Sequence, residues 1–184
     1  AALIAGLPQS VCGSTVNRWC GSSMQAIQMA AGAIAMGAGD AFVAGGVESM
    51  SRVPMMGFNP MPNPAWSDAQ RIAFLNMGLT AENLADRYGI SREEQDAYSL
   101  ESQKKALAAR ADGRLATEIA PIGDVAADGC PRETDAEKLA GLKTAFKAGG
   151  SVTAGNSSPL TDGASATLVC SEDFVKRHNL KPLA

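Results

Sequence analysis

The sequence contains only one histidine, His178, and its four cysteines include no Cys-x-x-Cys pair. Structural zinc sites are built from clusters of cysteine and histidine, so we expect no metal site. His178 lies at the expected end of a helix, where the helix dipole favours a surface histidine. The chain begins with no charged-then-apolar leader, and we therefore expect a cytoplasmic protein with reduced thiols.

Excess positive charge is also absent, because the formal net charge is −3. An acidic protein lacks the basic surface that binds nucleic-acid phosphates, so we expect no nucleic-acid partner. No charge occurs between Arg18 and Asp40, which raises a membrane span as an alternative. Glycines, serines and glutamines interrupt this segment and favour a buried helix in a protein without a membrane partner.

The charged residues are concentrated in the middle of the chain. Of the 35 charged side chains, 25 lie between residues 67 and 147. The flanks are core-like, whereas the middle has the composition of a solvated helical region. We therefore expect residues 1–50 and 161–184 to belong to one core domain, with residues 51–160 inserted into it.

The first flank carries the pattern of a strand, a buried helix and a second strand. Residues 10–19 are rich in β-branched side chains, and residues 41–47 (AFVAGGV) are typical of a strand covered on both faces. The helix between them is apolar on all sides, with one stripe formed by Met24, Ile27, Ala31 and Ile34. This predicts a βαβ unit with Cys20 at the strand-to-helix corner.

The insertion begins with an irregular segment, residues 49–66, that contains four prolines. A helix is expected from a Thr80 cap, and another from Ser91, with Glu94 completing a capping box and Gly113 ending the helix. The remaining expected elements are a strand over 117–122, a helix over 134–142, a loop over 151–165, a strand over 163–172 and a helix over 171–179.

Cys20 has two interpretations from its placement alone. A helix N-terminus favours a thiolate, Gly21 and Ser22 leave room for a carbonyl, and the Cys20 amide can donate to an oxyanion. Serine hydrolases present their nucleophile at a similar sharp turn. However, free cysteine is also a common core residue, so packing remains an alternative.

The other cysteines and the glycines of AGGVES (44–49) have simpler interpretations. Cys12 and Cys170 fall within expected strands and should be buried and inert, whereas Cys130 should be a loop thiol. The glycines are expected to allow close packing rather than to bind phosphate, since no helix cap follows in the required register.

Four blocks of the sequence resemble the thiolase family, in the family's order. They are VNRWCGSSMQA, GDAFVAGGVESMSRVPM, MGLTAENLADRYGISREEQDAYSLESQKKALAA and SVTAGNSSPLTDGASATLVCSE. The similarity is strongest to degradative 3-ketoacyl-CoA thiolases (acetyl-CoA acyltransferases). It implies an α/β, thiolase-like fold, in which a layered core half with a mixed sheet and a buried helix carries an inserted, mainly helical loop domain.

The resemblance also implies a reaction of the fatty-acid β-oxidation type. Cys20 matches the nucleophile that attacks a 3-ketoacyl-CoA, releases acetyl-CoA and passes its acyl group to free CoA. The implied ligand is therefore CoA as a substrate, with no tightly bound cofactor, and the implied assembly is a homodimer or homotetramer.

The inserted loop domain holds CoA in this family. Four residues match positions that contact CoA: Met77, Phe146, Ala154 and Ser158. Arg132 falls near the family's arginine that lies against the nucleotide. Asn76 departs from the family, because some thiolases have a histidine near the thioester at this position.

Three motifs of the family are absent from these 184 residues: Asn-Glu-Ala-Phe, Gly-His-Pro and the second cysteine in Cys-x-Gly. The family places them in a C-terminal domain, so we expect this chain to be a piece of a longer protein, inactive by itself and with apolar faces exposed. The alternatives are an acetoacetyl-CoA thiolase that works in the condensing direction, a non-catalytic acyl-CoA-binding module, and a carrier-protein-dependent condensing enzyme.

Overall fold

The structure is a computed structural model that describes residues 1–59 and 61–184. Pro60, within the irregular segment predicted over 49–66, lies outside the described residues. The chain divides into two compact units, one formed by residues 1–58 with 161–184 and the other by residues 59–160. Assigning these units to a thiolase core and a CoA-binding loop domain stays a prediction.

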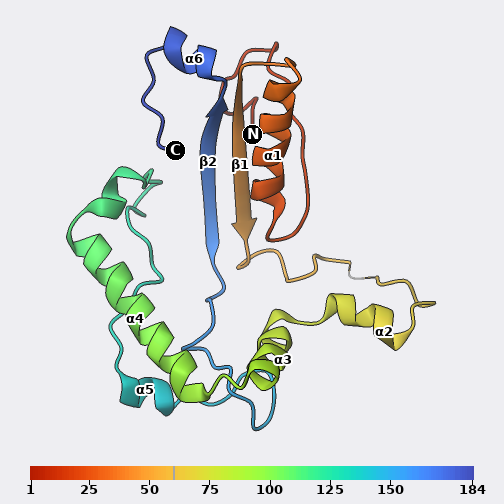
Figure 1. The fold of residues 1–184 in the computed structure, drawn as a ribbon, viewed down its shortest axis with the longest axis vertical. Helices are drawn as coiled ribbons and strands as arrows, with labels where there is room; N and C mark the ends of the chain where they lie inside the picture. The colour runs from red at the N-terminus through yellow and green to blue at the C-terminus, as the bar shows by residue number, and fades with distance from the viewer. Residues whose placement is uncertain (60) are drawn as a thin grey trace. The chain divides into compact units, whose positions relative to one another are not determined.

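The first unit is built on a two-stranded antiparallel sheet (Figure 1). Strand β1 (Ala41–Ser49) pairs with β2 (Asp162–Cys170) over their full lengths, from Ala41 opposite Cys170 to Ser49 opposite Asp162. Helix α1 (Ser22–Ala35) packs against this sheet, and helix α6 (Glu172–Arg177) follows β2. The predicted second strand and closing helix are therefore confirmed.

Close packing between α1 and β1 depends on a glycine. A Cβ atom placed on Gly46 would lie 1.9 Å from the Ser23 hydroxyl oxygen, closer than any real contact. The prediction that the AGGVES glycines allow close packing is confirmed at Gly46. This contact brings the first turn of α1, two residues after Cys20, directly against the strand.

The strand predicted over residues 10–19 is wrong. Residues 12–17 have no regular structure, and among the described residues no strand forms a ladder with them. A strand needs a hydrogen-bonded neighbour, and β-branched composition does not supply one. The βαβ unit is consequently wrong as well, because β1 pairs with β2 in antiparallel fashion and Cys20 follows an irregular segment and a turn instead of a strand.

The predicted burial of the first flank is also wrong for this chain. Ala30 is the one buried residue of α1, although the helix is apolar all round. In β1, Ala44 is buried, whereas Val43 and Val47 on the opposite face are 65% and 81% exposed. A sheet with a helix on one face buries alternate residues only. The apolar pattern of α1 and β1 is therefore typical of elements packed against more neighbours than the described residues supply.

The second unit is mainly helical, as predicted. Its elements are α2 (Asp68–Arg71), the 3₁₀ helix η1 (Ile72–Phe74), α3 (Met77–Tyr88), α4 (Arg92–Ala111), the 3₁₀ helix η2 (Arg114–Thr117) and α5 (Ala136–Ala140). Helix α4 packs against α5, which confirms the helix predicted over 134–142. The strand predicted over 117–122 is wrong, because this segment forms a single bridge between Ile122 and Val125. Pro121 has no N–H with which to extend a ladder.

Local capping signals predicted one helix start correctly and missed the other. Helix α4 begins at the predicted capping box, in which Ser91 and Glu94 each accept a backbone hydrogen bond from the other. Helix α3 begins at Met77 with Asn76 as its cap, whereas Thr80 lies inside the helix and donates to the Asn76 carbonyl. Across the described residues, no helix is both long and apolar enough to cross a membrane.

Removing the α4 cap should destabilise the second unit. We expect Ser91→Ala to lower the free energy of unfolding by about 1 kcal/mol, because it leaves the Glu94 amide without its acceptor. Ser99→Ala is the matched control, since the Ser99 hydroxyl bonds only within the helix, and its effect should stay within about 0.5 kcal/mol. Urea denaturation followed by circular dichroism measures both, and equal effects would contradict the capping role.

Candidate functional site

Cys20 occupies a tight turn immediately before α1. The Gly21 amide donates to the Arg18 carbonyl at 2.9 Å, and the Ser22 amide donates to the Trp19 carbonyl at 3.0 Å. Trp19 has a φ of 46°, in the left-handed region that bulky residues rarely adopt. The turn leaves the Cys20 thiol exposed at the start of the helix.

Side-chain hydrogen bonds hold this strained turn in place. The Ser22 hydroxyl accepts from the Arg18 amide at 2.8 Å and donates to the Trp19 carbonyl at 2.6 Å. The Arg18 guanidinium donates to the Gln25 side chain, one turn into α1, at 2.9 Å. Such backbone strain costs about 1–3 kcal/mol and persists where neighbouring contacts enforce it, most often at functional sites.

The surroundings of Cys20 favour a reactive thiol over a packing residue. Gly21, the N-cap of α1, has no side chain, so the helix begins without a side-chain cap. The packing alternative is not supported, because Cys20 is exposed. An exposed cysteine beside an uncapped helix N-terminus fits the nucleophile predicted from the sequence.

The other cysteines differ from their predicted environments. Cys12 is exposed and lies outside any strand, so its predicted burial is wrong. Cys170 ends β2 as predicted but is half-buried instead of buried. Cys130 lies outside the helices and strands, as predicted for a loop thiol. Cys12 is therefore the thiol whose exposure matches that of Cys20.

In the second unit, two of the predicted CoA-contacting residues line one pocket. Arg132 and Ala154 lie in a pocket of about 460 Å³ between α4, α5 and the loop that follows residue 150. The Arg132 amide is held by the Gln103 side chain of α4 at 2.9 Å. Ser158 is exposed and is not part of this lining, although its neighbour Ser157 is.

Two further predicted contacts meet at the start of α3. Met77 is the first residue of this helix and is 68% exposed. The Phe146 ring covers the next residue, because a Cβ atom on Gly78 would lie 2.2 Å from it. Asn76 uses its side chain to accept from the Gly78 amide at 2.7 Å, and it therefore serves as a helix cap.

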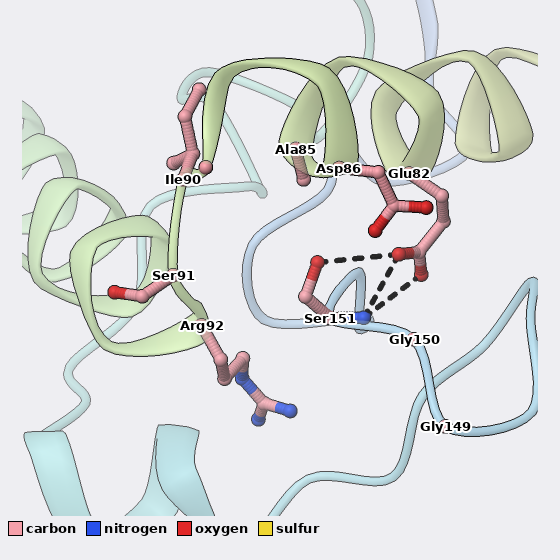
Figure 2. A pocket seen from close by; sticks show the side chains of 10 residues that line it. Glu82, Ala85, Asp86, Ile90, Ser91, Arg92, Gly149, Gly150 and Ser151 are labelled. Atoms are coloured by element: carbon pink, nitrogen blue, oxygen red, sulfur yellow. Dashed lines mark hydrogen bonds between the residues drawn. The ribbon is translucent and has the colours of Figure 1, made fainter.

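Sequence reasoning missed a buried carboxylate, Glu82, which is 1% exposed. One of its oxygens accepts from the Val152 amide at 2.9 Å. The other accepts from the Ser151 amide at 2.9 Å and from the Ser151 hydroxyl at 3.2 Å (Figure 2). Burial alone raises the pKa of Glu82, but these hydrogen bonds and the nearby Lys147 charge outweigh it and hold the pKa below its usual value.

A second buried network continues along the same loop. Asp96 of α4 accepts from Arg92 at 2.7 Å and from the Asn156 side chain at 3.0 Å. The fully buried Thr153 donates its amide to Asn156 at 2.7 Å, and its hydroxyl accepts from the Gly155 amide at 3.1 Å. The contact between Asn156 and Asp96 joins residues 60 positions apart, so no local pattern could have indicated it.

Neither unit offers a metal centre within the part of the chain that the structure describes, since no group of three histidine, cysteine or acidic side chains is arranged to hold an ion. The geometry of the first unit is compatible with nucleophilic attack by the exposed Cys20. Taken by itself, the second unit contains a pocket of about 460 Å³ lined by Arg132 and Ala154.

Comparison with known proteins identifies the family. Residues 1–173 match the N-terminal domain of thiolase. The chain belongs to the thiolase family. A probable acetyl-CoA acyltransferase of Staphylococcus aureus strain COL is 42% identical over 206 aligned residues, which cover 100% of this chain and 52% of the relative. The thiolase chain thus spans about half the length of the curated relatives it matches.

Solved structures show the same fold. Human mitochondrial 3-ketoacyl-CoA thiolase, crystallised in complex with CoA, matches with a TM-score of 0.82 at 37% identity, over 99% of this chain and 50% of that protein. Bacillus anthracis acetyl-CoA acetyltransferase matches with a TM-score of 0.80 at 40% identity, over 99% and 51%. The resemblance to thiolases and the α/β, thiolase-like fold are confirmed, whereas the individual site residues stay predictions.

Selective labelling tests whether Cys20 is chemically activated. In the protein as its gene encodes it, we expect iodoacetamide near neutral pH to alkylate Cys20 several times faster than Cys12, because Cys20 is the predicted nucleophile and Cys12 is not. Both thiols are exposed in the structure, so accessibility alone predicts equal rates. Peptide mapping by mass spectrometry compares them, and preferential labelling of Cys12 or Cys130 would remove the nucleophile assignment.

Proposed function

We propose that this thiolase chain supplies the nucleophile and CoA-binding surface of an enzyme that cleaves 3-ketoacyl-CoA with CoA. The observation that carries the proposal is the exposed Cys20 in a strained turn at the N-terminus of α1. The names of the relatives support it, as does the human thiolase crystallised with CoA. A non-catalytic binding module would have no use for a strained turn at this cysteine.

In the proposed reaction, the Cys20 sulfur attacks the 3-keto carbon of the substrate. The bond between C2 and C3 then breaks, and its electron pair leaves with acetyl-CoA as an enolate that takes up a proton. The acyl group remains on Cys20 as a thioester. The thiolate of a second CoA attacks this thioester and releases acyl-CoA, which restores the cysteine.

The second unit is proposed to bind CoA along the residues matched to the family. Arg132 brings a positive charge to its pocket, and Lys138 lies in the same lining, which suits the phosphates of a CoA nucleotide. Ser158, Met77 and Phe146 would contact the pantetheine chain. In this proposal CoA acts as a substrate that enters and leaves, and the pocket at Arg132 has a volume of about 460 Å³.

The same residues serve a second candidate reaction, the condensation of two acetyl-CoA molecules. The likeness to an acetyl-CoA acetyltransferase of known structure supports this alternative. The nucleophile is Cys20 in both directions. The two candidates therefore differ in the acyl-chain length that they prefer and in the direction in which the reaction proceeds.

Trapping the acyl-enzyme tests the proposed reaction. In the protein as its gene encodes it, incubation with acetoacetyl-CoA in the absence of free CoA should add an acetyl group to the Cys20 peptide. Cys20→Ala should show neither the adduct nor cleavage, because the attacking sulfur is gone. Cys12→Ala, the exposed control, should retain both. Mass spectrometry and loss of the acetoacetyl-CoA absorbance report the outcome; cleavage by Cys20→Ala would contradict the proposal.

Ser158 tests the proposed CoA path. Replacing this exposed serine by tryptophan should raise KM for CoA by about tenfold or more while changing kcat by less than about threefold, because binding common to substrate and transition state would be lost. Ala108→Trp on the exposed side of α4 is the bulky control and should change neither constant. Steady-state kinetics measure both variants; an unchanged KM in Ser158→Trp would place CoA elsewhere.

A further inference from the structure

We propose that Glu82 is a positioning residue, which holds the predicted CoA-binding loop in its binding conformation through the backbone amides of Ser151 and Val152. This inference rests on the proposed function, because the importance of the loop depends on CoA binding. Glu82 is on α3 and the loop follows about 70 residues later, so the contact joins two distant parts of the second unit.

The backbone of the loop passes very close to the Glu82 carboxylate. A Cβ atom on Gly150 would lie 2.2 Å from a Glu82 carboxylate oxygen, so only glycine allows this approach. Figure 2 shows the carboxylate directed at Ser151, with the glycine backbone passing beside it. A buried carboxylate is tolerated when donors satisfy both of its oxygens, as Ser151 and Val152 do here.

The held amides lie next to the predicted ligand contacts. Val152 is buried, and Thr153 after it is fully buried, with its hydroxyl accepting from the Gly155 amide at 3.1 Å. Ala154 lies between Thr153 and Gly155 and lines the pocket that contains Arg132. A shift of the Ser151–Val152 backbone would therefore move Ala154 within the pocket.

Glu82 also couples the two groups of predicted contacts. Its helix, α3, begins with Met77 and is covered at Gly78 by Phe146. The loop that it holds carries Ala154 and Ser158. The carboxylate consequently sets the spacing between the contacts at the start of α3 and those in the loop, although it belongs to neither group.

A negative charge is needed at this position because every neighbour that contacts it is a donor. The Ser151 amide, the Val152 amide and the Ser151 hydroxyl all donate to Glu82. A glutamine would direct its NH₂ group at an N–H group and lose at least one of these bonds. Lys147 adds attraction at longer range. It also forms an ion pair at 2.7 Å with Asp86, which lines a second pocket together with Glu82 and Ser151 (Figure 2).

The pH dependence of the contact has a definite sign. Since the pKa of Glu82 is lowered in the folded protein, its stabilising effect is complete above the usual glutamate value of about 4.3 and is lost as pH falls through the folded pKa. The loop is thus held throughout the neutral range, so Glu82 acts by position and not as a pH switch.

The test compares Glu82→Gln with the exposed control Glu101→Gln in the protein as its gene encodes it. We expect Glu82→Gln to raise KM for CoA by about tenfold or more, the effect of losing a hydrogen bond to a charged group, with kcat changed by less than about threefold. Hydrogen exchange at the Ser151 and Val152 amides should accelerate. Glu101→Gln, which loses only an exposed pairing with Lys105, should match the wild type.

If Glu82→Gln does not fold, a milder variant tests the proposal instead. Ser151→Ala removes one of the donors to Glu82 and should raise KM for CoA in the same direction by a smaller factor. Calorimetric titration of the wild type with CoA distinguishes a failure of the proposed function from a failure of the proposed role of Glu82. A wild type that does not bind CoA overturns the proposed function, whereas CoA binding with an unchanged KM in both variants overturns the role of Glu82.

Discussion

The buried Glu82 carboxylate is the contact on which the second unit depends. It joins α3 to the Ser151–Val152 backbone, and Asp96 of α4 joins the same loop through Asn156. A loop rich in glycine and serine has little side-chain volume with which to form a core. Its order therefore comes from charged acceptors that face its backbone amides in a buried setting, where hydrogen bonds to a charge are strong.

The first unit depends instead on close packing between a helix and a strand, in which a glycine on the strand leaves room for the helix. Gly46 lets Ser23, in the first turn of α1, approach β1 closely. The turn before the helix then places Cys20, and hydrogen bonds of Ser22 offset the strain at Trp19.

A short-range signal can be predicted from the sequence when both partners lie within a few residues. The Ser91–Glu94 capping box is an example. Prediction failed where an element needed a distant neighbour: residues 10–19 have strand composition, but no described strand pairs with them. The burial of Glu82 was not predicted, since its partners are backbone amides about 70 residues later in the chain.

The sequence by itself determined the family, the α/β class, the mainly helical middle region and Cys20 as the candidate nucleophile, because these depend on residue identity and local order. Only the tertiary structure decided that β1 and β2 pair in antiparallel fashion, that Arg132 and Ala154 share a pocket, and that Glu82 is buried. The physical reason is that pairing and burial are relations between segments far apart in the chain. A residue's own chemistry sets what it can bind, and the fold decides what it meets.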